Sequence, residues 1–432
     1  MPAEKSPILT DEFKDALALL ESKPAVKPLI FITGRAGTGK TTLLKYFAQH
    51  TAQNVVVLAT TGLAAINVHG QTVHSFFQLK PGNLLDRALL RRLPRKKVES
   101  FDTLIIDEAS MLRADLLDAM DHILRISTRT DEPFGGKQLI LFGDLFQLPS
   151  VEENAQSGLF DYFQARYKSP YFFEAHVLRE LPLEVFELKR IFRQSADKEY
   201  ARILNLIRQG TISQPELDSL LNRRVLPETP DVVENSILLS TTNQSAMWRN
   251  RSQLAKLPGE EFVYTATADE TFTKTPPADR ELHLKKGAKI MMLVNDDNWV
   301  NGDIGTVYDL GPDFIHVELN GAVYEVQPYV WDEVTYELNP LTQKLAPKVK
   351  GFFKQYPLKL AWAITIHKSQ GLTFDNIYLD MGRGAFATGQ TYVALSRCRT
   401  LAGVHLKRPI STQDVQCDTR VQQFFETVKG AR

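Results

Sequence analysis

Residues 28–45 read Pro-Leu-Ile-Phe-Ile-Thr-Gly-Arg-Ala-Gly-Thr-Gly-Lys-Thr-Thr-Leu-Leu-Lys, an apolar run, a glycine-punctuated loop and then residues that favour a helix. Gly34, Gly39, Lys40 and Thr41 fit the G-x-x-x-x-G-K-[ST] pattern of a phosphate-binding loop. In such a loop, backbone N–H groups close on phosphate oxygens and the following helix N-terminus adds a positive dipole. The stretch predicts a nucleotide site, with Lys40 on the β- and γ-phosphates and Thr41 on Mg²⁺.

The apolar run at 28–33 is the first of several short, continuous apolar runs, as expected for strands that are covered on both faces. The others in the first half of the chain are Asn54–Ala59, Thr103–Asp107 and Gln138–Phe142, with helical patterns between them. A further helix is expected over Asp11–Glu21. This alternation predicts an α/β fold with a doubly wound parallel sheet.

A second set of strands and helices follows from about residue 185. Apolar runs at Ser236–Thr241, Leu360–Thr365 and Asn376–Met381 predict strands, and Asn243–Leu257 predicts a helix. Between them, residues 289–329 alternate apolar and polar side chains and contain the turn signal Asn320-Gly321. We therefore expect a second parallel α/β domain that carries a small antiparallel β-barrel.

The composition is that of an ordinary soluble globular protein long enough for two or three domains, with 432 residues, 43% hydrophobic and 24% charged. Lys plus Arg equals Asp plus Glu, at 51 each, so any nucleic-acid surface must be local. Cys398 and Cys417 are the only cysteines, which excludes a disulfide scaffold and fits a reducing compartment. No apolar run is long enough to span a bilayer, so we expect a soluble, intracellular protein.

A local basic run follows the second predicted strand. Arg87, Arg91, Arg92 and Arg95–Lys97 lie within a stretch that interrupts the α/β rhythm between residues 80 and 100. The run fits either a solvated helix and loop or an arm that contacts phosphates, and the sequence leaves both open.

Two further motifs follow predicted strands of the first domain. Asp107 and Glu108 end the third strand, where Asp107 would hold Mg²⁺ and Glu108 would polarise the water that attacks the γ-phosphate. Gln147 follows the fourth strand, where its amide could sense the γ-phosphate, although a plain polar loop residue fits as well. From the second domain, Arg193 and Arg397 are candidates to stabilise the charge that develops on the γ-phosphate.

The ordered set of motifs resembles superfamily-one helicases of the 5′-to-3′ branch, closest to the Pif (petite integration frequency) type and more distantly to RecD. The matching strings are GRAGTGKTT (34–42), ATTGLAAINVHGQTVHSFF (59–77), IIDEASML (105–112), GDLFQLPSV (143–151), KRIFRQ (189–194), WAITIHKSQGLTFDNIYLD (362–380) and TYVALSRCRT (391–400). Residues 113–137 resemble the Pif signature region and separate this chain from RecD.

The resemblance implies two RecA-like P-loop domains: the first over residues 1–185 with an arm at about 64–101, the second over 186–432 with a Src-homology-type barrel at about 285–355. It implies an ATP- and Mg²⁺-dependent DNA helicase that acts on single-stranded DNA and forks, and extends to RNA–DNA hybrids, G-quadruplexes and roles in DNA repair, recombination and telomere maintenance. A monomer is expected in the absence of DNA.

The resemblance also carries residue roles. It assigns the nucleotide to Gly34, Ala36, Gly37, Thr38, Gly39, Lys40, Thr41, Thr42, Gln370 and Gly371, the metal to Thr41 and Asp107, catalysis to Lys40, Glu108, Gln147, Arg193 and Arg397, and single-stranded DNA to Thr60, Thr61, Gly62, His74, Thr365, His367 and Lys368. Phe13 is also expected among the nucleotide-binding residues, at the position where related chains commonly use a glutamine near the N-terminus to read adenine. We therefore expect hydrolysis of other nucleotides besides ATP.

Two other functions remain open at this point. An ATP-responsive clamp or remodeller of nucleic acid would need the same loop without processive unwinding. A small-molecule kinase on a P-loop fold would need an acceptor pocket and would have no use for a second α/β domain with its arginines.

Overall fold

The computed structural model describes residues 9–22, 27–79, 84, 90–150, 163–194, 197–272, 276–338 and 345–430. These residues form two compact units. The first unit contains the described residues within Lys5–Phe192, Glu333–Lys350 and Asp418–Arg432, and the second contains those within Arg193–Asp332 and Gly351–Cys417. Arg87, part of the basic run, lies outside the described residues. Within the described ranges, no helix combines the length and apolarity needed to cross a membrane.

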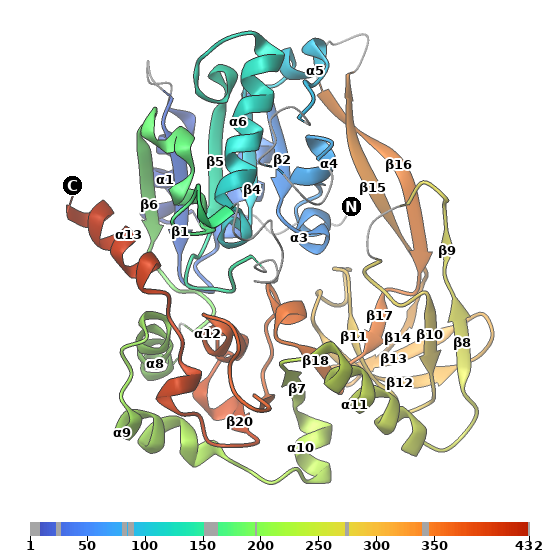
Figure 1. Cartoon of the computed structure of the whole chain (residues 1–432). Helices are drawn as coiled ribbons and strands as arrows, with labels where there is room; N and C mark the ends of the chain where they lie inside the picture. The colour runs from blue at the N-terminus through green and yellow to red at the C-terminus, as the bar shows by residue number, and fades with distance from the viewer. Residues whose placement is uncertain are drawn as a thin grey trace. The chain divides into compact units, whose positions relative to one another are not determined.

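A six-stranded parallel sheet is the centre of the first unit (Figure 1). Its spatial order is β3-β2-β4-β5-β1-β6. The strands are β1 (Leu29–Gly34), β2 (Val55–Ala59), β3 (Gln71–Thr72), β4 (Thr103–Asp107), β5 (Gln138–Gly143) and β6 (Leu183–Leu188). The predicted α/β class with a RecA-like parallel sheet is confirmed for this unit.

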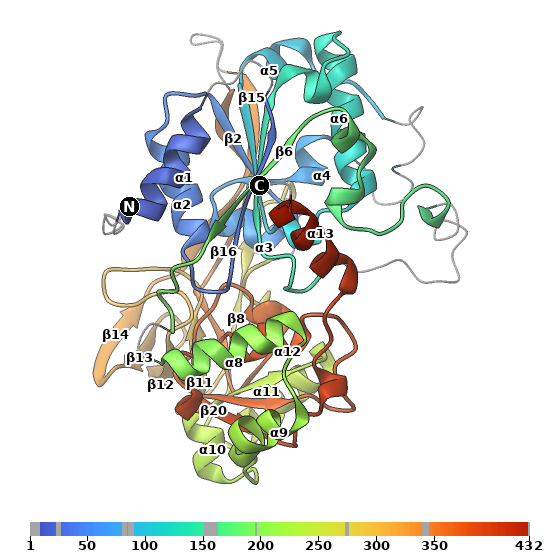
Figure 2. The same ribbon diagram turned by 90° about the vertical axis from the view of Figure 1, so that its left-hand side faces the viewer.

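Alternate residues of the central strands pack on opposite faces of this sheet. In β1, Leu29 and Phe31 join one hydrophobic core, whereas Ile30 and Ile32 join the other, and β2, β4 and β5 alternate in the same way. Figure 2 shows the helices on the two sides. One face is covered by α1 (Asp11–Glu21), α2 (Lys40–His50) and α3 (Gly62–Asn67). The other face is covered by α4 (Val73–Phe76), α6 (Ala114–Thr128) and α13 (Thr419–Gly430). A short helix, α5, spans Arg95–Glu99.

The predicted boundary at residue 185 separates three segments from the first unit: the chain that continues to Phe192, the described residues within Glu333–Lys350, and those from Asp418 onward. That boundary cuts through β6, which pairs with β1 along its whole length from Leu29↔Leu183 to Gly34↔Leu188. The last of these segments carries α13, which follows the second sheet in sequence but packs on the first. Phe424 stacks on Phe173 with ring centroids 4.5 Å apart, and Phe425 stacks on Phe146 at 5.3 Å.

The basic run is partly described. Arg91, Arg92 and Lys96 are exposed, and Arg95 pairs with Glu99 at 2.6 Å. Lys97 instead lies over the ring of Phe76, 4.0 Å from its centroid, and donates to the Phe76 carbonyl oxygen. Burial lowers the pKa of Lys97 to about 8. This lysine therefore has a packing role.

The second unit contains a four-stranded parallel sheet of order β18-β7-β19-β20. Its strands are β7 (Ile237–Ser240), β18 (Ala363–Thr365), β19 (Ile377–Asp380) and β20 (Val404–Leu406), and its helices are α8 (Lys198–Gln209), α9 (Gln214–Glu216), α10 (Pro230–Asn235), α11 (Asn243–Lys256) and α12 (Gln390–Leu395). The predicted second parallel layer is confirmed.

Antiparallel strands occupy the region where a barrel was expected. A five-stranded sheet has the order β14-β13-β12-β11-β17, a two-stranded ribbon pairs β10 with β8, and a third sheet has the order β15-β16-β9. The strands are β8 (Phe262–Thr265), β9 (Thr267–Ala268), β10 (Glu281–Leu284), β11 (Lys289–Met292), β12 (Ile304–Leu310), β13 (Ile315–Leu319), β14 (Ala322–Val326), β15 (Tyr329–Leu338), β16 (Leu345–Gln355) and β17 (Leu358–Leu360). The predicted hairpin at Asn320-Gly321 joins β13 to β14, and both turn residues have positive φ angles, 53° and 79°.

We expect Phe424→Ala to lower the free energy of unfolding by about 2 kcal/mol, because the half-buried ring loses its aromatic contacts with Phe173 and Phe172. Denaturant unfolding of the full chain measures this change. Gln423→Ala is the matched control, since Gln423 is its exposed neighbour on α13 and should change stability by less than about 0.5 kcal/mol. Equal unfolding midpoints for the two variants would contradict the packing role of α13.

Candidate nucleotide and DNA site

The loop between β1 and α2 is shaped by its glycines. Gly34, Gly37 and Gly39 have positive φ angles of 154°, 79° and 85°. A Cβ atom on Gly34 would lie 2.6 Å from the carbonyl oxygen of Leu188 and 2.8 Å from Oγ1 of Thr38, so no larger residue fits there without movement. Gly39 in the left-handed conformation is the N-cap of α2. This geometry directs the first N–H groups of an 11-residue helix at the loop, as phosphate binding requires.

Lys40 and the threonines follow this loop in the first turn of α2. Lys40 Nζ donates to the carbonyl oxygens of Gly34 at 2.6 Å and Arg35 at 3.0 Å, so the ammonium group lies over the start of the loop. Thr41 and Thr42 are exposed, whereas Ala36 and Thr38 are buried. The loop therefore offers backbone N–H groups, one ammonium group and exposed hydroxyls.

Asp107 and Glu108 lie at the carboxyl end of β4. Burial, and then the negative charge of Glu108, raise the pKa of Asp107 to about 7, while the charges of Lys40 and Lys45 act in the opposite direction. The Glu108 N–H donates to Oδ1 of Asp107 at 2.9 Å. Glu108 itself adopts a left-handed backbone, with φ 55° and ψ 48°, which a glutamate rarely does. The strand end therefore combines a buried carboxylate with a second carboxylate on a sharp backbone turn.

Gln147 lies in the loop after β5, beside the end of β4. Gly143 is so close to the segment after Glu108 that a Cβ on it would lie 2.9 Å from the Ala109 nitrogen. The Gln147 N–H donates to the Asp144 carbonyl oxygen at 2.9 Å, and both side chains are buried. The first unit thus brings together the ends of β1, β4 and β5, which carry its predicted catalytic and metal-binding residues.

Phe13 lies on α1 and belongs to the hydrophobic core. Its side chain is 2% exposed, and its ring would be 3.3 Å from a Cβ placed on Gly39. The neighbouring Glu12 accepts from the backbone N–H groups of Lys189 and Arg190. Phe13 therefore packs against the phosphate loop, and its side chain offers no hydrogen bond to a base.

The DNA residues predicted in the first unit have structural partners. Thr60 Oγ1 donates to the carbonyl oxygen of Glu108 at 3.1 Å, and Thr61 Oγ1 caps α3 by accepting from the Ala64 N–H. A Cβ on Gly62 would meet no atom within 4 Å, so the backbone is open there. Burial lowers the pKa of His74, which favours its neutral form. The link from Thr60 to Glu108 connects this segment directly to the carboxylate motif.

In the second unit, Arg193 and Arg397 converge on one short loop. Arg193 Nη1 donates to the Ser396 carbonyl oxygen at 3.1 Å, and Nη2 lies 3.5 Å from that of Gly371. The buried Arg397 donates through Nε to Val393 at 2.9 Å and through Nη1 to the carbonyl oxygens of Ser369 and Leu372 at 3.3 Å. Burial, and then the charge of Arg397, lower the pKa of Arg193 to about 9. The two guanidinium groups are therefore close enough to repel one another.

The loop that these arginines contact contains the remaining predicted residues. Thr365 is buried at the end of β18, and its Oγ1 accepts from the Lys368 N–H. His367 and Lys368 lie in a 3₁₀ turn, η8 (His367–Ser369). The buried Nε2 of Gln370 has no hydrogen-bond partner within the described part of the chain, and Gly371 has a φ angle of 81°. DNA and nucleotide candidates thus follow one another on a single loop.

The residues present fit a nucleotide with Mg²⁺. Thr41 and Asp107 supply a hydroxyl and a carboxylate, and Mg²⁺ typically takes one or two carboxylates plus substrate phosphates. No group of three or more His, Cys, Asp or Glu side chains in the described residues could hold a metal ion by itself. The loop, which has no room for a Cβ at Gly34, would hold the phosphates.

The sequence did not predict the structural role of two residues near the site, Gln194 and Tyr200. Gln194 is buried and donates from Nε2 to the carbonyl oxygens of Ser396 and Cys398, which joins the segment of Arg193 to that of Arg397. The hydroxyl of Tyr200 donates to the Leu395 carbonyl oxygen. Gln194 ends the string KRIFRQ, but its type alone did not indicate a buried bridge.

Comparison with known proteins agrees with the fold and the motifs. A family model described as "PIF1-like helicase" matches residues 9–218. The ATP-dependent DNA helicase PIF1 of Rattus norvegicus is 32% identical over 100% of this chain and 66% of its own length. The mouse protein of the same name is 33% identical over 93% of this chain and 61% of its own length. The chain thus spans about three fifths to two thirds of these relatives.

Solved structures match over nearly the whole chain. Bacteroides sp Pif1 in complex with ADP-AlF4 is 34% identical, with a TM-score of 0.87 over 98% of both chains. Bacteroides Pif1 bound to ssDNA is 35% identical, with a TM-score of 0.70 over 98% of both chains. The chain belongs to the PIF1-like helicase family.

Proposed function

We propose that this chain is an ATP-dependent DNA helicase that moves 5′-to-3′ along single-stranded DNA and unwinds the duplex ahead of it. The observation that carries the proposal is the meeting of the phosphate loop, the Asp107–Glu108 strand end and the Gln147 loop in one unit. The charge of Lys40 acts on Asp107, which supports a common site for the two motifs. The direction of movement rests on the family resemblance.

Within the proposed site, each side chain acts on a different part of the phosphate. Lys40 and the N–H groups at the start of α2 neutralise charge on the β- and γ-phosphates. Glu108 orients the attacking water and accepts its proton, and the Gln147 amide donates to the γ-phosphate. Thr41 and Asp107 would hold Mg²⁺, and the ion would supply positive charge to offset the negative charge that develops on the phosphates.

Arg193 and Arg397 supply positive charge from the second unit. Two guanidinium groups that repel one another are stabilised when an anion binds beside them. The lowered pKa of Arg193 supports this role, since burial and Arg397 both disfavour its charge until a phosphate is present. We propose that Arg193 contacts the γ-phosphate and that Arg397 mainly holds the loop from Ser369 to Leu372 in place.

DNA binding is coupled to hydrolysis through shared loops. Thr365, His367 and Lys368 precede Gln370 and Gly371 on one loop, and Thr60 bonds the backbone of Glu108. Hydroxyls and backbone N–H groups can contact phosphates without reading sequence. We propose that ATP binding and hydrolysis switch the two units between closed and open arrangements, which produces the step along the strand.

Forked DNA is included among the proposed substrates. A solved Pif1 structure that is 35% identical to this chain is described as a basis for DNA unwinding at forked dsDNA by two coordinating Pif1 helicases. RNA–DNA hybrids and G-quadruplexes are also proposed as substrates, on the basis of the family resemblance.

Strand displacement on duplexes with a single 5′ tail or a single 3′ tail tests the proposed function. We expect ATP-dependent unwinding of the 5′-tailed substrate only. Unwinding confined to the 3′-tailed duplex would reverse the polarity, and ATP-dependent DNA binding without unwinding would favour a clamp. ATP turnover that does not respond to single-stranded DNA would favour a small-molecule kinase.

Lys40→Ala is the inactive control for these measurements. Loss of the ammonium group should abolish ATP turnover and unwinding, while nucleotide-free binding of single-stranded DNA should remain within about twofold of wild type. Retained turnover would refute the assigned nucleotide site.

We expect ATP and GTP to be hydrolysed with kcat/KM values within about tenfold of one another. The reason is that Phe13 replaces a side chain that could hydrogen-bond the base, and a site without such a bond discriminates weakly. Steady-state turnover with each nucleotide at saturating DNA measures the ratio. An ATP preference on the order of 10⁴ would show that another group reads adenine.

Replacement of Arg397 by lysine should cost about 2–4 kcal/mol of folding free energy, because lysine keeps the charge but cannot bond the carbonyl oxygens of Val393, Ser369 and Leu372 together. Denaturant unfolding measures the loss. Arg399→Lys is the matched control, since Arg399 is exposed and pairs with Asp375 at 3.4 Å. If Arg397→Lys unfolds at the same denaturant midpoint as wild type, the structural role of Arg397 is refuted.

A further inference from the structure

An exposed phenylalanine lies in the loop between β19 and α12. The ring of Phe386 is 63% exposed, although its neighbours along the chain, Ala385 and Ala387, are more protected. Leaving a phenylalanine in water forfeits about 1.5–3 kcal/mol of burial free energy. The exposed ring of Phe386 therefore favours contact with a ligand that has an apolar face.

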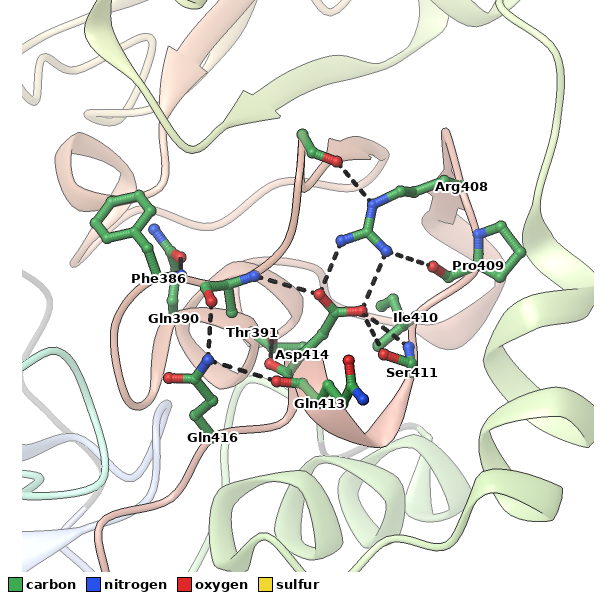
Figure 3. A network of polar contacts seen from close by, with 12 residues as sticks. Phe386, Gln390, Thr391, Arg408, Pro409, Ile410, Ser411, Gln413, Asp414 and Gln416 are labelled. Atoms are coloured by element: carbon green, nitrogen blue, oxygen red, sulfur yellow. Dashed lines mark hydrogen bonds and ion pairs between the residues drawn. The ribbon is translucent and has the colours of Figure 1, made fainter.

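The backbone that carries Phe386 is anchored by a polar network (Figure 3). The Phe386 N–H donates to Oε1 of Gln390 at 3.1 Å, and the Ala385 N–H donates to Oδ1 of Asp414 at 3.2 Å. Nε2 of Gln416 donates to the Ala385 carbonyl oxygen at 2.8 Å. Both sides of the peptide group before Phe386 are thus bonded, and the ring is exposed from a restrained backbone.

Asp414 is the centre of this network. Its carboxylate accepts from Arg408 Nη2 at 2.8 Å and from the Ser411 N–H at 2.9 Å, as Figure 3 shows. Burial alone would raise the pKa of Asp414, but the charge and hydrogen bonds of Arg408 and Ser411 outweigh it and lower the pKa to about 2. The anchor therefore remains charged and intact across the neutral pH range.

A second aromatic ring lies beside Phe386. The rings of His367 and Phe386 are nearly parallel, at an interplanar angle of 16°, with centroids 6.3 Å apart. Burial lowers the pKa of His367, so the imidazole is mainly neutral at pH 7. The two rings come from the loops after β18 and β19, two strands that both pair with β7 in parallel. They therefore project from the same, carboxyl-terminal edge of the sheet.

Positive charge accompanies these rings. Lys368 follows His367 directly and is exposed, and Arg383 is exposed in the same loop as Phe386. Aromatic faces interleaved with cations match the alternation of bases and phosphates in a single strand. An apolar protein partner would make less use of the two cations.

We propose that Phe386 and His367 form a stacking platform for one base of single-stranded nucleic acid, with Lys368 and Arg383 on the flanking phosphates. This inference rests on the proposed function and adds Phe386 and Arg383 to its contacts with the strand. Stacking on Phe386 needs no base-specific hydrogen bond, so the platform accepts any of the four bases.

Equilibrium binding of the full chain to a labelled dT oligonucleotide, with Phe386 replaced by Ala, Leu and Trp, tests the platform. We expect Phe386→Ala and Phe386→Leu to bind about 5- to 100-fold more weakly, because both lose the planar face, and Phe386→Trp to bind within about twofold of wild type. The dependence of log K on log salt should keep its slope in all three, whereas Lys368→Ala should reduce the slope by about 1.

An abasic oligonucleotide of the same length supplies the control for stacking. Wild type and Phe386→Ala should bind it equally, since no base is present to stack. If Phe386→Leu binds dT as tightly as wild type, or if Phe386→Ala weakens both oligonucleotides alike, the stacking platform is refuted. Failure of the wild type itself to bind single-stranded DNA would instead overturn the proposed function.

Discussion

The close approach of Gly34 to Leu188 is the constraint on which the nucleotide site depends. Pairing of β1 with β6 brings the two backbones together, and no Cβ fits between them. The chain beyond β6 adds a second link, because the Phe192 N–H donates to the Gly37 carbonyl oxygen at 2.8 Å. The next residue is Arg193, the first of the second unit. The phosphate loop is thus braced by the segment that leads directly to a proposed catalytic arginine.

Both units place their proposed functional groups by the same rule. Residues within parallel strands are committed to two hydrophobic faces, so polar side chains gather where the strands end. In the first unit these ends carry Lys40, Asp107 and Gln147, and in the second the loops after β18 and β19 carry His367 and Phe386. A change of the residues at these strand ends therefore alters the chemistry of the site through the loops alone. Within each unit, the sheet keeps the distances between its loops.

Most of the fold was predictable because buried parallel strands read as continuous apolar runs. β1, β4 and β5 were predicted to within one or two residues. β6 was missed because Leu183–Leu188 lies at the sheet edge and its apolar residues are interrupted by Glu184 and Glu187. Motif spacing predicted Lys40 and Asp107 as site residues, but the bonds of Arg397 to the Ser369 and Leu372 carbonyl oxygens depend on tertiary contacts between segments more than 20 residues apart, which no local pattern records. The exposure of Phe386 was equally invisible, because apolar residues are expected to be buried.

The return of α13 to the first sheet has a consequence during synthesis on the ribosome. The first unit cannot complete its core until Val421, Phe424 and Phe425 have been made, after the entire second unit. At typical translation rates the roughly 225 intervening residues take about 10–45 s. During that interval Phe146, Phe172 and Phe173 lack their cover. The nascent first unit therefore exposes an aromatic surface that favours chaperone binding or aggregation until α13 has been made.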